Sequence, residues 1–184
     1  MLPARVMEKT FLADNVVRLV LRLPRAQRLQ FLAGQYVDVL VEGGKRRAFS
    51  IASSPSREDE IELHIRHVEG GGFTGFVFDE LEVRGILRLE GPQGTFFVRH
   101  DHPERPMIMM GGGTGFAPFA SILRDPETYD KFDEVIITHT CRDVAELAYS
   151  RETVEAFLND PDIGEIGQGK LRLYQTCTRE DFEK

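Results

Sequence analysis

Short stretches in which apolar and polar residues alternate fill the first hundred positions of the chain. Alternation with a period of two is typical of strands that bury one face. Segments rich in glycine, proline and asparagine separate these stretches and predict turns, with Asp14-Asn15 closing the first hairpin. A helix is expected over residues 74–81, with Thr74 as its N-cap. The expected strands, which favour a small antiparallel β-barrel, are residues 4–12, 16–23, 36–41, 46–52, 61–67 and 86–90.

The pattern changes after residues 100–103. Residues 107–110 form a continuous apolar run that ends in glycines, and a helical stretch follows it. Strands that alternate with helices predict βαβ units and a parallel sheet. The further elements expected are a strand over 134–140, a helix over 151–159 and a strand over 170–178. The sequence therefore predicts two domains, an antiparallel β-barrel over 1–100 and an α/β parallel-sheet domain over 106–184, with a boundary near 101–105.

The composition excludes several classes of function. Of the 184 residues, 41% are hydrophobic and 29% are charged, which is ordinary for a globular protein. The net charge of −7 argues against a nucleic-acid partner, because binding phosphates requires clustered Lys and Arg. No apolar run approaches the roughly 20 residues that span a bilayer, and the N-terminus lacks a signal-peptide pattern. We therefore expect a cytoplasmic protein with no membrane partner.

Cysteine and histidine usage narrows the chemistry further. Cys141 and Cys177 are too few for a disulfide framework or a thiolate-bound iron–sulfur cluster. Any one-electron chemistry would therefore require an organic cofactor. No carboxylate spacing completes a metal site around His64, His67, His100 or His102, so we expect no metal.

Residues 47–53 carry the side chains that a flavin dinucleotide needs. Arg47 can pair bidentately with a pyrophosphate, Phe49 can form a flat apolar wall, and Ser50 can offer a hydroxyl near N5 of the ring. The glycines at 70–72 and Thr74 predict a second anion site at a helix start. In a regular strand Ser50 points away from Arg47 and Phe49, so all three reach one cofactor only at a strand end, a twist or a bulge. The alternative is an ordinary edge strand, with Arg47 solvated and Phe49 in the core.

Residues 113–118, Gly-Thr-Gly-Phe-Ala-Pro, lie between an apolar strand and a helix. A glycine-rich turn in this place can cradle a diphosphate. Pro118 departs from the pattern G-x-G-x-x-G but suits the first turn of a helix, where its missing N–H does no harm. A tight strand-to-helix turn without a ligand is the alternative.

Two arginines follow the ends of the next two predicted strands. An acidic residue at the adenosine ribose is typical of NAD sites, whereas arginine is typical of NADP sites. Arg142 and Arg179 could bind a 2′-phosphate; the alternative pairs them with the neighbouring Asp143 and Glu180. Cys141 could contact the cofactor or could be a small buried hydrophobic residue.

Residues 47–53 resemble the Arg-x-(Tyr/Phe)-Ser-x-x-Ser signature of the ferredoxin–NADP reductase superfamily. The form Gly-x-Gly-x-x-Pro at 113–118 is also the one that this superfamily uses. The resemblance runs over essentially the whole chain. Further segments that carry it are the Phe-x-Ala-Gly-Gln-Tyr lead-in at 31–36, the strand at 61–66, the phosphate turn at 71–74 and the Gly-Pro-x-Gly turn at 91–94.

The resemblance implies a flavoprotein with FAD and NADP as cofactors, NAD being the alternative to NADP. Hydride would pass from NADPH to FAD and on to ferredoxin, flavodoxin or a free flavin. Arg47 and Thr74 would hold the pyrophosphate and Phe49 would stack on the ring. Ser50 at N5 and Thr114 at the nicotinamide contact would be the catalytic positions. The flavin-site residues would be Arg47, Ala48, Phe49, Ser50, His64, Ile65, Arg66, Gly71, Gly72, Phe73 and Thr74. The nucleotide-site residues would be Gly113, Thr114, Gly115, Pro118, Cys141, Arg142 and Arg179.

Two departures from the family pattern matter. The α/β part supplies three of about five parallel strands, and the remainder would normally carry a Cys-Gly motif near the nicotinamide. Residues 1–105 most resemble the flavin domains of NAD(P)H–flavin reductases and CDP-6-deoxyglucoseen-type reductases, whereas residues from about 107 onward resemble bacterial ferredoxin–NADP reductases. The chain could be a fragment, a chimera or a complete protein. The alternative function is a flavin-binding module whose incomplete nucleotide domain allows little turnover.

Overall fold

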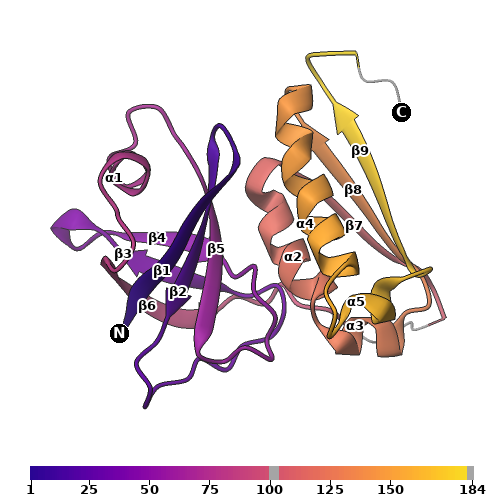
Figure 1. Ribbon diagram of the computed structural model, residues 1–184, viewed down its shortest axis with the longest axis horizontal. Helices are drawn as coiled ribbons and strands as arrows, with labels where there is room; N and C mark the ends of the chain where they lie inside the picture. Colours follow the sequence, from indigo (N-terminus) through magenta and orange to yellow (C-terminus); the bar gives the residue numbers. More distant parts are fainter. Residues whose placement is uncertain (100–103, 182–184) are drawn as a thin grey trace.

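The computed structural model describes residues 1–99 and 104–181. Figure 1 shows two parts side by side, a barrel of strands from the first half of the chain and a three-stranded sheet with helices from the second. The boundary expected near 101–105 falls largely on residues 100–103, which lie outside the described residues, as do His100 and His102. The domain limits therefore stay a prediction.

The first part is an antiparallel sheet of six strands in the order β4-β3-β6-β1-β2-β5. An antiparallel bridge between Ile51 and Leu63 joins the two outer strands, β4 and β5, and so closes the sheet. The predicted antiparallel barrel is confirmed, including the hairpin at Asp14-Asn15. Its strands are β1 (Leu2–Ala13), β2 (Val16–Arg22), β3 (Tyr36–Leu40), β4 (Arg46–Ser50), β5 (Glu60–Arg66) and β6 (Ile86–Gln93).

Fully buried aliphatic residues from these strands fill the barrel. Leu19 and Leu21 of β2 are fully buried in this core, as the period-two pattern predicted, whereas Val20 between them is also buried but lies outside this core cluster. A short helical turn, η1 (Glu42–Gly44), joins β3 to β4, and the helix α1 (Gly72–Asp79) packs Val77 against the same core. Burial of these side chains on folding is the main source of stability in this part.

The second part is a parallel sheet in the order β7-β8-β9. Figure 1 shows α2 and α4 on the face of this sheet that turns toward the barrel. Val135, Ile137, His139 and Cys141 alternate along β8 as its buried residues. The strands are β7 (Met107–Gly112), β8 (Val135–Cys141) and β9 (Leu171–Cys177). The helices and helical turns are η2 (Gly113–Phe116), α2 (Ala117–Leu123), α3 (Pro126–Lys131), η3 (Val144–Leu147), α4 (Ala148–Leu158) and α5 (Gly164–Gly167).

Three helices of the α/β part differ from the sequence prediction. The helix expected over 151–159 begins at Ala148, directly after η3, so the predicted start came one turn late. The helices α3 and α5 were not predicted, because four to six residues are too short to establish a helical period. Asp125 nevertheless caps α3 by accepting a hydrogen bond from Glu127 N–H.

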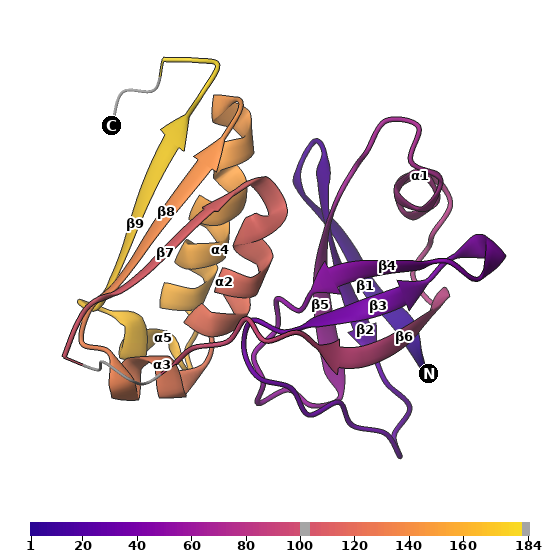
Figure 2. The same ribbon diagram turned by 180° about the vertical axis from the view of Figure 1, so that it is seen from behind.

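Helix α2 carries much of the contact between the two parts. The Ser121 hydroxyl donates to the Ser53 carbonyl at 2.7 Å, and Arg124 Nη1 donates to the Ala52 carbonyl at 2.9 Å. Ala33 and Ala52 from the first half of the chain also pack in the hydrophobic core around α2 and α4. The far face of the sheet, seen in Figure 2, leaves Ile108 and Met110 exposed.

Candidate active site

A cleft of about 560 Å³ lies where the barrel meets the glycine turn of the α/β part. Its walls come from β4, the end of β5, the turn into α1, and η2 with the start of α2. The residues that line it are Arg47, Ala48, Phe49, Ser50, His64, Arg66, Val68, Gly71, Gly72, Phe73, Thr74, Thr114, Gly115 and Ala117. Most residues predicted for the flavin site therefore share one cleft with Thr114 and Gly115 of the predicted nucleotide turn.

Strand β4 presents both of its faces to the cleft. Arg47 and Phe49 share one face and Ala48 and Ser50 the other, yet all four line the cavity. The pairing of β4 with β3 is regular as far as Ser50, so no bulge in this ladder turns the side chains. The strand instead comes first in the strand order, and the Ile51–Leu63 bridge to β5 lies just beyond its end, so the cleft can run along the outer edge of β4. Because the cleft borders this strand, Ser50 can line it together with Arg47 and Phe49 although Ser50 points to the other face.

Two phenylalanine rings and the Arg47 side chain line the same cleft. The rings of Phe49 and Phe73 lie 5.5 Å apart between centroids, tilted by 44°, and both pack against the barrel core. Arg47 is exposed and donates to the Arg46 carbonyl at 3.0 Å. Within residues 1–99 and 104–181 its guanidinium forms no ion pair. The side chain is therefore available to an anionic ligand.

The turn into α1 differs in detail from the prediction. Helix α1 begins at Gly72 with Gly71 as its N-cap, so Thr74 is not the cap. The Thr74 hydroxyl instead accepts from Val68 N–H at 3.1 Å and lies 3.2 Å from the Val68 carbonyl oxygen, which ties the turn together. A Cβ at Gly71 would lie 2.6 Å from this hydroxyl, whereas a Cβ at Gly72 would meet nothing within 4 Å. The backbone at the helix start is thus open to an anion.

Strand β5 contributes alternate residues. His64 and Arg66 line the cleft, whereas the side chain of Ile65 points the opposite way and is fully buried in the barrel core. Alternation along a strand makes this outcome necessary. The Ile65 side chain therefore does not line the cleft, and the place of Ile65 in the flavin site stays a prediction. The Arg66 guanidinium donates to Glu146 Oε1 at 2.7 Å and thereby links the cleft to η3 of the α/β part.

A second hollow of about 740 Å³ adjoins the cleft. It extends from the end of β3 to β6 and shares Arg47, Gly72 and Phe73 with the cleft. The cation and the helix start therefore lie at the junction of two neighbouring cavities.

The glycine turn has a conformation that requires glycine at one position. Gly113 has φ +53°, and a Cβ there would lie 3.1 Å from Arg66 Nη1. Its carbonyl accepts from His139 Nε2 at 2.9 Å, and His139 is fully buried. Burial lowers the pKa of His139 despite its hydrogen bond to the carbonyl, which keeps the imidazole neutral. A buried histidine thus holds the start of the turn.

We expect Gly113→Ala to lower the free energy of unfolding by about 1 kcal/mol, because alanine is strained at positive φ. Gly115→Ala is the matched control. A Cβ at Gly115 would meet nothing within 4 Å, and Gly115 is not one of the glycines with a positive φ. Urea unfolding of both variants makes the comparison. Equal stabilities would contradict the conformation assigned to the turn.

The remaining predicted nucleotide-site residues lie around this turn. Pro118 lies in the first turn of α2, as the sequence predicted. It is buried and is not among the residues that line the cleft. Cys141 is buried at the end of β8, 3.6 Å from the His139 ring nitrogens, and burial raises the pKa of its thiol to about 11. The burial of Cys141 fits the small buried hydrophobic residue, and contact of Cys141 with the cofactor stays a prediction.

Arg142 and Arg179 are brought together by the sheet. Arg179 N–H donates to the Arg142 carbonyl at 3.0 Å, just beyond the paired ends of β8 and β9, and both side chains are exposed. In the described part of the chain neither guanidinium forms an ion pair with Asp143 or Glu180. The Glu180 carboxylate accepts instead from Val144 N–H at 2.8 Å. The juxtaposition expected from the sequence is present.

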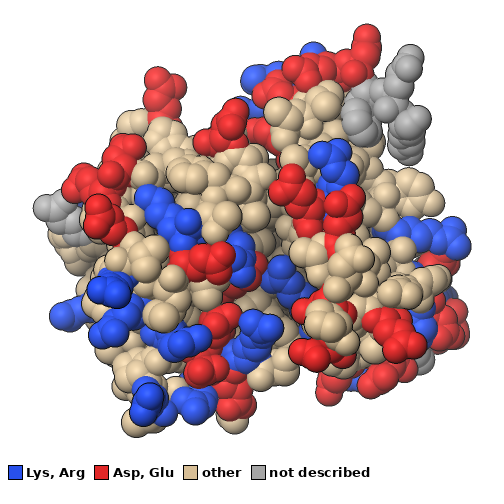
Figure 3. All heavy atoms as spheres, in the orientation of Figure 1, with Lys and Arg blue, Asp and Glu red and all other residues tan. Residues whose placement is uncertain are grey.

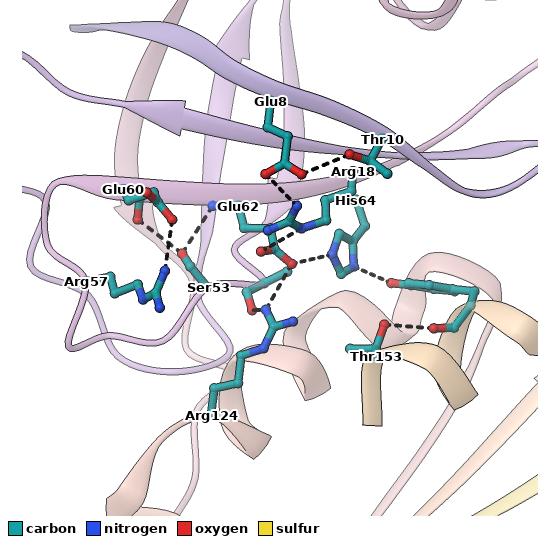
Figure 4. A network of polar contacts seen from close by, with 12 residues as sticks. Glu8, Thr10, Arg18, Ser53, Arg57, Glu60, Glu62, His64, Arg124 and Thr153 are labelled. Carbon is teal, nitrogen blue, oxygen red and sulfur yellow. Dashed lines mark hydrogen bonds and ion pairs between the residues drawn. The ribbon is translucent and has the colours of Figure 1, made fainter. Parts of the chain in front are cut away.

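The sequence did not reveal a buried polar network beneath the cleft. Glu62 of β5 is 5% exposed and accepts from Arg18 Nε at 3.0 Å, from Arg124 Nη1 at 2.9 Å and from His64 Nε2 at 2.8 Å. His64 Nδ1 in turn lies 2.6 Å from the Tyr149 hydroxyl of α4. Figure 4 shows these side chains converging from the barrel and from α2 on the Glu62 carboxylate. The network therefore joins the two parts of the molecule.

Charge and burial oppose each other at Glu62. Burial alone would raise the pKa of this carboxyl, but the charge of Arg124, the hydrogen bond from His64 and the charge of Arg18 hold it well below its usual range. Burial lowers the pKa of His64, so the imidazole is neutral beside an ionised carboxylate. In the sequence, this network is indicated only by the polar residues that occupy every second position of β5.

Comparisons with known proteins identify the family of the chain. Residues 3–98 match the family of oxidoreductase FAD-binding domains, and the chain belongs to this family. The flavodoxin/ferredoxin–NADP reductase of Rhodobacter capsulatus is 43% identical over 165 residues, which is 88% of this chain and 61% of the relative. The CDP-6-deoxy-L-threo-D-glycero-4-hexulose-3-dehydrase reductase of Yersinia pestis is 45% identical over 121 residues, 66% of this chain and 36% of the relative.

Solved structures give the same architecture. The Amycolatopsis cytochrome P450 reductase superimposes with a TM-score of 0.78 at 31% identity, covering 98% of this chain and 53% of that protein. A ferredoxin–NADP⁺ reductase from Neisseria gonorrhoeae with bound FAD and NADP superimposes with a TM-score of 0.77 at 22% identity, covering 98% of this chain and 70% of that protein. The fold is that of ferredoxin–NADP reductase-like flavoproteins, as the sequence resemblance implied, and the chain spans between a third and about three-fifths of the curated relatives named above.

Two further findings concern the described part of the chain. None of its helices has the length and apolarity needed to cross a membrane. Nor do three of its His, Cys, Asp or Glu side chains cluster in a way that could hold a metal ion.

Proposed function

We propose that the chain is a flavoprotein oxidoreductase that passes hydride from NADPH to bound FAD and electrons on to ferredoxin, flavodoxin or a free flavin. The observation that carries the proposal is one cavity lined both by Phe49 and Ser50 of β4 and by Thr114 and Gly115 of the glycine turn. A flavin against β4 and a nicotinamide against the turn would meet there, as hydride transfer between two cofactors requires.

The side chains of the cleft fit FAD, which supplies a ring that takes up electrons in pairs and releases them singly or in pairs. Phe49 and Phe73 would form the apolar wall, and Ser50 would offer its hydroxyl to the polar edge of the ring. Arg47 and the N–H groups at the start of α1 would bind the pyrophosphate. The adjoining 740 Å³ hollow gives a dinucleotide room to extend past Arg47, which favours FAD over a mononucleotide flavin.

Arg142 and Arg179 would bind the 2′-phosphate of NADPH, since both are exposed and adjacent at the carboxyl ends of β8 and β9. We expect the double variant Arg142→Ala/Arg179→Ala to lose the preference for NADPH over NADH, because NADH lacks that phosphate. Reduction kinetics with both nucleotides measure the preference. Arg172→Ala is the control, since Arg172 lies on β9 but pairs with Glu134 at its other end. A double variant that still prefers NADPH would contradict the assignment.

The name of the Rhodobacter capsulatus relative supports ferredoxin or flavodoxin as the acceptor. Figure 3 shows Lys and Arg gathered over the lower barrel and Asp and Glu over the base of the α/β part. An acidic electron-transfer protein would be attracted to the barrel side rather than to the α/β side.

A flavin-binding module with little turnover is the second candidate. It is favoured by the match to the FAD-binding family, which covers residues 3–98 and therefore the barrel part alone. A diaphorase assay separates the candidates, with the FAD-saturated protein, NADPH and ferricyanide as an artificial acceptor. Our proposal predicts NADPH oxidation that requires both FAD and Arg47. FAD binding without NADPH oxidation would leave the binding module as the function.

A further inference from the structure

Helix α4 begins with two successive buried hydroxyl side chains. Tyr149 Oη lies 2.6 Å from Nδ1 of His64, which belongs to β5 of the barrel. Ser150 Oγ lies 2.7 Å from Nδ1 of His139, which belongs to β8 of the parallel sheet. Tyr149 is 1% exposed and Ser150 is fully buried. A single helical turn thus contacts one buried histidine in each part of the molecule.

The second nitrogen of each imidazole shows which atoms carry the protons. His64 Nε2 lies 2.8 Å from Glu62 Oε1, and His139 Nε2 lies 2.9 Å from the Gly113 carbonyl oxygen. A carboxylate and a carbonyl oxygen can only accept, so each Nε2 carries the proton and each Nδ1 of the neutral ring accepts. Tyr149 and Ser150 are therefore the donors to the two histidines.

One histidine belongs to the barrel wall of the candidate active site, and the other supports the glycine turn of the α/β part. His64 borders the cleft with a side chain that is only 1% exposed, and His139 hydrogen-bonds to the carbonyl of Gly113, where the glycine turn begins. The Tyr149 ring meets both imidazoles edge-on, with centroid distances of 5.2 Å to His64 and 5.8 Å to His139. Figure 4 shows His64 reaching from the barrel toward the helices of the α/β part.

We propose that Tyr149 and Ser150 are positioning residues that set the glycine turn at 113–115 against the β4 side of the cleft. This inference rests on the proposed function, in which a nicotinamide at the turn meets a flavin at β4. Neither residue lines the cleft, so both act through the histidines that they orient. Reacting atoms must lie about 3–3.5 Å apart for such a transfer, and a displacement of about 1 Å costs on the order of 100-fold in rate.

The test compares Tyr149→Phe and Ser150→Ala with Thr153→Val in the FAD-saturated protein. Thr153 is a buried hydroxyl on the same helix that donates to the Tyr149 carbonyl at 2.7 Å. Among the described residues it forms no hydrogen bond with either histidine, which makes it a matched control. Stopped-flow reduction by NADPH gives the rate and the apparent Kd. We expect each hydroxyl variant to reduce its flavin roughly tenfold more slowly, with a Kd within about twofold of the parent. Thr153→Val should match the parent in both.

Imidazole ¹⁵N NMR of the same proteins, without nucleotide, provides a readout that does not depend on activity. The parent should show both histidines protonated at Nε2. Tyr149→Phe should change the His64 signals alone, and Ser150→Ala should change those of His139 and shift the amides of 113–115. Parent-like rates in both hydroxyl variants, or a parent histidine protonated at Nδ1, would overturn the inference. A parent flavin that NADPH does not reduce would refute the proposed function instead, and the NMR spectra would then decide the positioning role by themselves.

Discussion

Glu62→Gln is expected to lower the free energy of unfolding by about 3–5 kcal/mol, the cost of breaking a buried ion pair by removing one partner. Arg18 and Arg124 both direct their guanidinium groups at this carboxylate, and they come from different parts of the molecule. A neutral amide would leave the mostly buried Arg124 without its counter-charge and Arg18 with only the half-exposed Glu8. Urea unfolding monitored by circular dichroism measures the loss.

The control for this variant is Glu60→Gln, two residues earlier on β5. Glu60 pairs with Arg22 at 3.5 Å and with Arg57 at 3.3 Å, but both arginines are more than half exposed. Exposed pairs contribute about 0–1 kcal/mol, so the control should stay close to the parent. Similar losses in the two variants would mean that burial does not set the strength of the Glu62 network.

The same carboxylate predicts a dependence on pH. A carboxyl whose pKa is lowered by folding contributes stability that is fully present above its ordinary value of 4.5 and is lost as the pH falls through the lower folded value. We therefore expect the stability of the parent protein to fall with acid below about pH 4.5, and Glu62→Gln to fall less steeply over that range. Parallel acid profiles would contradict the lowered pKa of Glu62.

Arg47→Ala is expected to weaken FAD binding by about 1.5–3 kcal/mol, or roughly 10- to 150-fold in Kd, the scale of a hydrogen bond to a charged group. Arg47 is the cation shared by the two cavities, and its guanidinium forms no ion pair with any of the described residues. Titration of flavin fluorescence with each protein gives the Kd.

Arg46→Ala makes the matched comparison for this variant. Arg46 is the neighbouring residue on β4, lies outside the cleft lining and pairs with Glu90 at 2.8 Å. Its removal takes away the same charge from the same strand, so general electrostatics would affect both variants alike. An unchanged Kd in Arg47→Ala would remove Arg47 from the flavin site.

The sequence predicted those elements whose residues form a recognisable pattern within one continuous segment of the chain. Alternation gave the strands of the barrel, and the run of apolar residues before the glycines gave β7 and its turn into α2. Thr74 was misassigned because glycine at 71 and 72 permits an earlier helix start that side-chain capping rules do not detect. The short helices α3 and α5 depend on packing against α4 and α2 rather than on a period of their own.

The flavin and nucleotide motifs could be read from the sequence because each is contiguous. The network around Glu62 could not, since its members come from β2, β5, α2 and α4 and meet only after folding. His64 was predicted to border the flavin, but its bond to Tyr149 joins residues 85 positions apart. No role was predicted for His139, because the sequence of an apolar strand does not indicate which carbonyl its histidine will hydrogen-bond.

An anaerobic titration of the FAD-saturated protein with NADPH, followed near 450 nm, tests the central claim most directly. Fast bleaching of the flavin absorbance at stoichiometric NADPH is the predicted result, because Thr114 and Gly115 share one cavity with the residues that would hold the ring. A bound flavin that stays oxidised under excess NADPH would contradict the claim that nicotinamide and flavin meet in this cleft.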